Sequence, residues 1–259
     1  MNAAGRRGRI VRLALAGVLL AGCGNAPAPD AAGEVRIEYR KVPHQLAPLQ
    51  KALRTSGRLE EVAARVEKIA GLTEDVTVRV RSCKDGTQYF DRRVDFCVQD
   101  FAEVRKEMKD AGEEDLMATV LDDAAATLLH ELAHAAIDLR DLPVTGREED
   151  VADQFVVWQA VEGLDDPDIV LAQAFEYALS QDLYEQVADD EHTADGQREA
   201  NLLCWLYGSD PQAWEHLVDD DPLTEDRAPL CVEEWDLLVH GWTTILGQSW
   251  RSGEEPEEE

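Results

Sequence analysis

The sequence predicts a mainly helical α+β fold with a small β-sheet, and three observations support this class. Hydrophobic residues make up 44% of the 259 residues, with only 17 glycines and 10 prolines, which is the balance of a globular chain rather than a collagen-like or disordered one. Apolar residues recur at helical spacing over most of the second half. Two short stretches within residues 76–98 instead have the pattern of strands.

The first 22 residues have the three parts of an export signal. An arginine-rich stretch precedes an apolar run at 13–20, and the string LAGC ends at Cys23. The run is too short to span a bilayer, and small residues before a cysteine suit a lipoprotein-processing peptidase. We therefore expect Cys23 to carry lipid and to anchor an extracytoplasmic protein to the cell membrane. The alternative is a plain secreted protein whose signal happens to end near a cysteine.

Composition divides the rest of the chain into three parts. Residues 23–40 are predicted to be a lipidated tether, residues 41–250 a folded domain that is helical from about 165, and residues 251–259 a solvated acidic tail. Acidic residues number 54 against 25 basic ones, a formal net charge of −29. This charge opposes binding to a phosphate backbone, so we expect no nucleic-acid partner.

The first part of the domain is predicted to contain two short helices and a hairpin. Apolar residues recur at helical spacing over 46–70, with an interruption near 56–57. Apolar and polar residues alternate over 76–80, and 89–98 is a second strand-like run. These runs predict a hairpin with residues 84–86 in its turn.

Nearly all of the remaining domain is predicted to be helical. Most of the six tryptophans lie in the last third of the chain, where we expect them to form the core of a helical part. The helical periodicity covers residues 113–139, 147–163, 167–184, 195–208, 211–218 and 231–248.

The four cysteines that follow Cys23 are predicted to form two disulfides. Three pairings are possible, and an exported protein permits them. Cys83 and Cys97 lie near the facing ends of the predicted hairpin, and Cys204 and Cys231 close a later helical segment, so local pairing is favoured. A zinc–thiolate site is disfavoured, because neither pair has the gap of two to four residues found in such sites.

The candidate chemistry lies in the sequence HELAH at residues 130–134, within the helix predicted at 113–139. The spacing puts His130 and His134 one turn apart on one helix face, where a nitrogen of each ring can reach the same zinc ion at about 2.0–2.1 Å. Glu131 lies beside them and can accept a proton from a water that the zinc activates. The alternative is two histidines on an amphipathic helix without a metal.

A catalytic zinc site also needs a third protein ligand. The glycine and histidine of the metzincin extension are replaced here by Ile137 and Arg140, so the ligand must come from elsewhere. On the next predicted helix, Glu149 and Asp153 are four residues apart. One carboxylate can bind zinc while the other accepts the free N–H of a ligand histidine.

Glu148, Glu149 and Asp150 are consecutive, so their positions on the helix decide which of them is the candidate ligand. Thr145 and Glu148 have the spacing of a capping box, which assigns Glu148 to the start of the helix. The residue four positions after Asp150 is Gln154, which supplies no second carboxylate. Glu149 is therefore favoured, and Asp150 and Asp153 remain alternatives.

These motifs resemble those of known zinc peptidases. HELAH followed after 14 residues by ExxxD resembles the gluzincin clan of zincin-like enzymes, whose third ligand is the Glu of the ExxxD helix. The segments HELAHAAIDLRDLPVTGREEDVADQF and DDEHTADGQREANLLCWLYGSDP are similar to a bacterial family of domains of unknown function described as metallopeptidases, and the similarity runs from about residue 76 to 231. The resemblance implies a small sheet beside the HExxH helix, zinc ligands His130, His134 and Glu149, the base Glu131, and the pairs Cys83–Cys97 and Cys204–Cys231.

One segment departs from that family. Where the family has Asn-Ala before an aromatic pair in the strand that lines the cleft, this chain has Thr87 and Gln88 before Tyr89 and Phe90. The departure leaves the pairing of substrate with that strand open.

His192 is a second candidate catalytic residue. In gluzincin-like sites a downstream imidazole donates a hydrogen bond to the oxyanion that forms during attack on the amide. A solvent-exposed histidine that caps a helix among acidic residues explains His192 equally well. His44, His216 and His240 lack such company, and we expect them at the surface or in satisfied core positions.

Together, these observations predict a zinc-dependent metallopeptidase that is lipid-anchored outside the cell membrane and acts on peptide or protein substrates. One alternative is a zinc amidohydrolase that acts on cell-wall peptides. The other is a zinc-binding lipoprotein without catalysis, whose site is structural or binds a partner. An open fourth coordination position separates the enzymes from the structural site.

Overall fold

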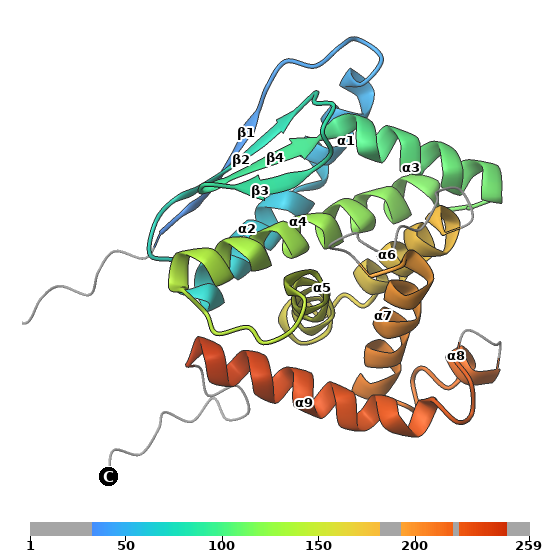
Figure 1. Cartoon of the computed structure of the whole chain (residues 1–259). Coiled ribbons are helices and arrows are strands. Elements are labelled where there is room, and N and C mark those ends of the chain that lie inside the picture. Colours follow the sequence, from blue (N-terminus) through green and yellow to red (C-terminus); the bar gives the residue numbers. More distant parts are fainter. Residues whose placement is uncertain (1–32, 182–192, 220–222, 248–259) are drawn as a thin grey trace, which may run out of the picture. The chain divides into compact units, whose positions relative to one another are not determined.

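A computed structural model describes residues 33–181, 193–219 and 223–247, and it confirms the mainly helical α+β class with a small sheet (Figure 1). The predicted signal at 1–22, Cys23, the tail at 251–259 and His192 lie outside the described residues. The elements in chain order are β1 (Val35–Tyr39), α1 (Ala47–Ser56), α2 (Arg58–Ala70), β2 (Val76–Arg81), β3 (Gln88–Phe90), β4 (Arg93–Cys97), α3 (Val98–Ala111), α4 (Leu116–Arg140), α5 (Glu148–Trp158), a π-helical turn (Gln159–Gly163), α6 (Asp168–Ser180), α7 (Asp195–Ser209), α8 (His216–Asp219) and α9 (Ala228–Leu246).

The sheet has the strand order β1-β2-β4-β3, and this order corrects the predicted hairpin. β2 runs parallel to both β1 and β4, so the runs at 76–80 and 89–98 are not antiparallel partners. The antiparallel partner of β4 is β3, which lies inside the second run. Asp91 and Arg92 join them with φ angles of 45° and 62°, the left-handed pair of a two-residue type I′ turn. Neither residue is glycine or asparagine, so no turn signal marked the break.

Two further elements were not expected from the sequence. β1 lies within the range assigned to the tether, where its Val35 stands opposite Val76 of β2 and donates its backbone N–H to Glu67 Oε1 of α2 at 2.6 Å. α3 follows β4 without a break and buries Phe101 and Met108. In the second half, the helix predicted at 211–218 shortens to α8, and residues 211–215 form turns.

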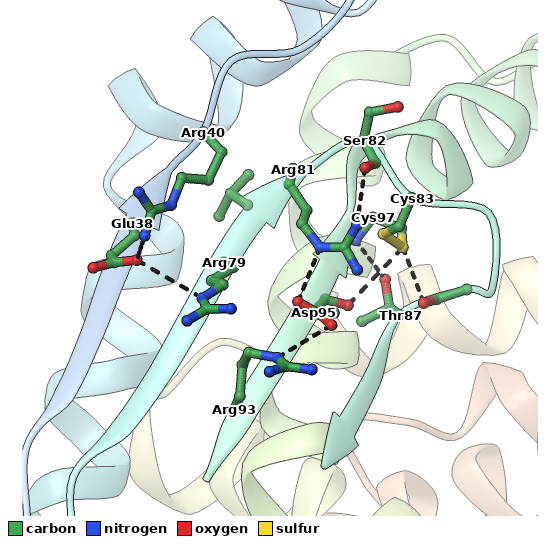
Figure 2. Close-up of polar contacts among 12 residues, drawn as sticks. Glu38, Arg40, Arg79, Arg81, Ser82, Cys83, Thr87, Arg93, Asp95 and Cys97 are labelled. Carbon is green, nitrogen blue, oxygen red and sulfur yellow. Dashed lines mark hydrogen bonds and ion pairs between the residues drawn. A yellow bond between two sulfur atoms is a disulfide. The ribbon is translucent and has the colours of Figure 1, made fainter. Parts of the chain in front are cut away.

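The two faces of the sheet differ in composition. Along β2 the valines are fully buried, whereas the residues between them are partly exposed. On the solvent side Asp95 accepts hydrogen bonds from Arg81 and Arg93, and Glu38 lies between Arg40 and Arg79 (Figure 2). We refer to these six residues as the outer sheet face.

The long helix α4 is buried over most of its surface and organises the domain. It contacts β3 and β4 of the sheet, and it packs against α2, α3, α5 and α6 (Figure 1). Its middle carries the alanines at 124–126 and three fully buried leucines, an apolar surface that suits a helix enclosed by neighbours. The sequence HELAH lies in this enclosed part, so its polar side chains are placed inside the domain.

The C-terminal helices form a second packed region. Trp158 of α5 and Trp242 of α9 stack with ring centroids 6.2 Å apart, and Trp205 and Trp235 are also buried, as expected. Gly208 of α7 lies directly against α9: a Cβ atom there would be 2.2 Å from the carbonyl oxygen of Cys231. The absence of a side chain at this position lets the two helices approach closely.

Both predicted disulfide pairings are present. Cys83–Cys97 joins the loop after β2 to the end of β4, with Cα atoms 5.3 Å apart. Cys204–Cys231 joins α7 to α9, with Cα atoms 5.0 Å apart. Among the described helices, none has the length and apolar character needed to cross a membrane.

Candidate metal centre

Three side chains from two helices converge on one point. His130 and His134 lie one turn apart on α4, and their Nε2 atoms are 3.2 Å apart. Oε2 of Glu149, in the first turn of α5, lies 2.9 Å from Nε2 of His130 and 3.4 Å from Nε2 of His134. Within the described ranges these three residues are the group whose donor atoms could hold a metal ion, all within 4.8 Å of one another.

Carboxylates on α5 fix both imidazole rings. Nδ1 of His130 is 2.9 Å from Oδ1 of Asp153, and Nδ1 of His134 is 2.7 Å from Oε1 of Glu148. When each Nδ1 carries the proton and donates it to its carboxylate, the lone pair of each Nε2 faces the common point. A bond of this kind is the usual way in which a protein sets the tautomer of a metal-binding histidine.

The contact made by Glu148 corrects its predicted role. The N-cap of α5 is Arg147, and no side chain caps this helix end. Thr145 and Glu148 therefore do not form a capping box. Glu148 instead supports His134, a contact across helices that local sequence spacing does not reveal.

The other two candidate acids have separate partners. Oδ1 of Asp150 accepts a hydrogen bond from Thr193 Oγ1 at 2.6 Å, which holds its carboxylate on the side of α5 next to residue 193. Asp153 accepts two hydrogen bonds of 2.8 Å from Arg198 of α7. Glu149 is thus the acid that the structure brings to the two Nε2 atoms.

Arg198 is a member of the site that sequence reasoning missed. Arg198 is 8% exposed. Its guanidinium binds both oxygens of Asp153, and its Cζ atom lies 4.2 Å from the centroid of the Tyr177 ring. Burial alone would raise the pKa of Asp153, but His130 and Arg198 outweigh it and hold that pKa below its ordinary value. The segment around Arg198 has no motif that marks such a role, because the pairing depends on how α7 packs on α5.

The pKa values of both histidines are raised by the acids around them. Burial lowers the pKa of His134, but hydrogen bonds to Glu149 and Glu148 outweigh it and raise the pKa to about 9. Burial likewise opposes the charged form of His130, and its bonds to Asp153 and Glu149 raise its pKa above the ordinary value. A metal ion that binds here must displace these protons, so metal binding and proton release are coupled.

Glu131 lies beside the donor group without joining it. It is 7% exposed, and burial raises its pKa, while the two histidines and the backbone of Tyr89 favour its ionised form. Tyr89 belongs to the edge strand β3, and its hydroxyl donates a hydrogen bond of 2.7 Å to Oδ2 of Asp138 on α4. β3 is therefore fixed to α4 beside Glu131.

A cavity of about 200 Å³ opens next to the donor group. His130 and Glu131 form one end of it, and α3, α6 and α7 provide the other walls. Thr87, at the position where the chain departs from the resembled family, also lines this cavity and donates hydrogen bonds of 2.8 and 2.9 Å to Asp100. The donor group thus lies at the side of a partly open cavity rather than on a flat surface.

Comparison with protein families adds an independent finding. Residues 40–246 match the family described as "Putative metallopeptidase". Searches among curated proteins and among solved structures found no match. The family match covers well over half of the chain and includes both helices that carry the converging donors. The chain belongs to this family.

Proposed function

We propose that this chain is a zinc-dependent metallopeptidase that hydrolyses peptide bonds. The observation that carries the proposal is the convergence of His130, His134 and Glu149, with the buried Glu131 beside them, at one end of a cavity. A site made only for structure usually has four protein ligands, whereas this group offers three. Family membership supports the peptidase reaction.

The donor chemistry favours zinc. Two nitrogens bound to one zinc at about 2.0–2.1 Å with tetrahedral angles lie about 3.3 Å apart, and the two Nε2 atoms here are 3.2 Å apart. Two imidazoles and one carboxylate are a known ligand set for catalytic zinc, and each ring has the carboxylate partner that such ligands need. The residues therefore fit the ion without rearrangement of the rings.

The chain's own residues define the proton path. Bound zinc would supply Lewis acidity, which polarises a carbonyl and lowers the pKa of a water. The carboxylate of Glu131 accepts one proton from the attacking water and delivers it to the nitrogen of the departing amine, so the group is regenerated when the C–N bond has broken.

Orientation comes from the residues around the donors. Asp153 and Glu148 hold the imidazole rings, and Arg198 holds Asp153. The fixed edge of β3 next to Glu131 is suited to align an extended peptide by backbone hydrogen bonds. These contacts restrict the bound peptide to a geometry near that of attack.

The proposal places the enzyme outside the cell membrane, anchored through lipid on Cys23. The LAGC string supports the anchor, and the two disulfides fit an oxidising compartment. Mass spectrometry of the mature amino terminus tests it: a diacylated Cys23 is expected, and an unmodified terminus at another residue would exclude the anchor.

Two amide variants test the enzymatic roles. Glu131→Gln should retain roughly one zinc per chain and lose nearly all peptide cleavage, because Glu131 moves protons and does not hold the metal. Glu149→Gln should bind zinc at least about tenfold more weakly, because it loses a charged ligand. Zinc titration and a peptide-cleavage screen on both variants provide the measurement.

The matched control is Glu61→Gln, which changes an exposed glutamate on α2 and should behave like the wild type in both assays. A wild-type chain that binds no zinc would refute the metal assignment. Zinc binding without cleavage of any peptide would identify a zinc-binding lipoprotein, and cleavage confined to cell-wall peptides would identify an amidohydrolase.

A further inference from the structure

The cavity beside the metal centre extends along α4 away from the histidines. Asp123, Thr127 and Glu131 are spaced by four residues and line it from one helix face. Asp123 lies seven residues before His130, which is about 10 Å along the helix axis. Glu176 of α6 lines the same space from the opposite side.

Asp123 is buried beside this cavity, and one of its two carboxylate oxygens has no hydrogen-bond partner among the described residues. The residue is 2% exposed, and within the described part of the chain its Oδ2 has no donor. Oε1 of Gln173, which is 3% exposed and lines the same cavity, also lacks a donor there. Burying a carboxylate oxygen without a donor is unfavourable, so this arrangement is expected where a ligand completes it.

The carboxylates of the cavity are not neutralised by the wall. Arg198 is the lining residue with a fixed positive charge in the described part of the chain, and Asp153 binds it at two points. Burial, with repulsion from Glu176, raises the pKa of Asp123 well above its ordinary value. Burial also raises the pKa of Glu176 to about 7. The ligand that relieves both effects is a cation.

The geometry favours an organic cation over a second metal ion. Asp123 and Glu176 do not belong to any described group of three or more converging metal ligands. The walls also include the apolar side chains of Phe101 and Val104 and the ring of Tyr177. Apolar walls with carboxylates at one end match a side chain that has a methylene stem and a charged head.

We propose that this cavity binds the lysine or arginine side chain of a peptide substrate, at a position next to the bond that is cleaved. This assignment rests on the proposed function for the position of the peptide. A lysine or arginine side chain reaches about 6 Å from its Cα atom. From a peptide held at Glu131, such a side chain covers about half of the roughly 12 Å along α4 to Asp123, so its charged head lies near Thr127 and faces the carboxylate of Asp123.

The first test is substrate preference of the zinc-loaded full chain. A peptide library that varies the residues on both sides of the cleaved bond should give lysine or arginine at one fixed position. Asp123→Asn should lower kcat/KM for those peptides at least about tenfold and change it less than about twofold for peptides with norleucine at that position. The control Asp95→Asn alters a buried carboxylate on the outer sheet face and should leave the preference unchanged.

The second test measures binding without catalysis. Calorimetry on the metal-free full chain should detect N-acetyl-arginine amide binding more tightly than N-acetyl-norleucine amide. Asp123→Asn should remove the difference, and Asp123→Glu should retain it because the charge remains. If Asp123→Asn fails to fold, Glu176→Gln takes its place in both tests, since it removes the facing carboxylate.

The outcomes separate this proposal from the peptidase assignment. Cleavage without lysine or arginine preference, together with equal binding of the two amides, would overturn the cavity assignment and leave the peptidase intact. Selective arginine amide binding without cleavage of any peptide would overturn the peptidase and leave the cavity assignment intact. Stoichiometric binding of calcium or zinc to Glu149→Gln that requires Asp123 would show a metal site and overturn the cationic side chain.

Discussion

Two buried aspartates, one on the outer sheet face and one in the cavity, have opposite environments. Asp95 is 8% exposed and accepts hydrogen bonds from Arg81 at 2.9 Å and Arg93 at 3.2 Å (Figure 2). The hydrogen bond from Arg81 holds the pKa of Asp95 below its ordinary value. Asp123 is 2% exposed, has an oxygen without a donor among the described residues, and has a raised pKa.

This difference in pairing distinguishes acids that stabilise the fold from acids that we propose bind a ligand. On the outer sheet face, Asp95 is paired with Arg93 of its own strand and Arg81 of the neighbouring strand, and Glu38 is paired with Arg40 and Arg79, so each acid there is neutralised by the chain itself. In the cavity, one oxygen of the same chemical group has no donor among the described residues, at a position about two helical turns from the converging donors. Functional sites often retain such unfavourable arrangements because ligand binding requires them.

The largest effect is expected when a paired buried acid, Asp153, loses the arginine that neutralises it. Arg198→Met should leave Asp153 buried without its cation and destabilise the protein by about 3–5 kcal/mol. It should also weaken zinc binding about 10–100-fold, because Asp153 orients His130. Urea unfolding and zinc titration measure both effects. Arg198→Lys keeps the charge and should lose less on both counts; equal losses would argue against the charge as the cause.

Changing each aspartate to asparagine should have a smaller effect on the free energy of unfolding, and the sign of the effect should differ between Asp95 and Asp123. Asp95→Asn should lower the free energy of unfolding by about 1–3 kcal/mol, because two arginines lose their charged acceptor. Asp123→Asn should raise it by about 1 kcal/mol at pH 7, because a buried carboxyl group whose ionisation is disfavoured by burial is replaced by a neutral amide. Parallel urea titrations at pH 7 compare them. A loss of stability in both variants would contradict the distinction between the two regions.

The pH dependence of stability should give the smallest effect and the sharpest contrast in sign. Asp95 has a folded pKa below its ordinary 3.8, so its stabilising effect is complete above about pH 4 and is lost as the pH falls further. Glu176 has its pKa raised from 4.5 to about 7, so the folded state binds more protons than the unfolded state between these values. Its effect therefore destabilises the fold progressively as the pH rises from about 4.5 to about 7.

Unfolding curves from pH 3 to pH 8 measure this contrast. Asp95→Asn should approach wild-type stability at the acidic end, and Glu176→Gln should gain on the wild type toward pH 7. Beyond Asp123, the charged groups that act on Glu176 are Asp195, Arg198, Glu107 and Asp153. A Glu176→Gln variant that follows the wild-type curve at every pH would show that folding does not raise the pKa of Glu176.

The sequence allowed local features to be predicted, and contacts between distant segments escaped it. Helical spacing predicted that His130 and His134 share a face and that an acid of the next helix joins them, whereas the resemblance to gluzincins favoured Glu149 over Asp150 and Asp153. Arg198 meets Asp153 across 45 positions, and Glu148 reaches His134 from another helix. Such contacts are set by tertiary packing, which a single sequence does not display.

The sheet was predicted only in part for a similar reason. Alternation identified β2, but alternation does not say whether a neighbouring strand is parallel or antiparallel. Asp91 and Arg92 form a turn in the left-handed region, which is usually occupied by glycine or asparagine in such turns. The sequence pattern therefore predicted one continuous strand where the structure has β3 and β4. The cavity was missed because its walls come from four helices and one loop, which meet only in the folded chain.

The converging donors and the carboxylates that orient them all lie between His130 and Asp153, on two consecutive helices joined by a short loop. Two helices joined by so short a loop come together at little cost in chain entropy. The metal-binding residues and their carboxylate partners therefore form one local unit, and Arg198 of α7 supports it from outside through Asp153. The cavity, in contrast, is built from widely separated segments and can be remodelled one wall at a time. A substitution in one wall can thus alter the cavity while the two helices that carry the donors stay unchanged.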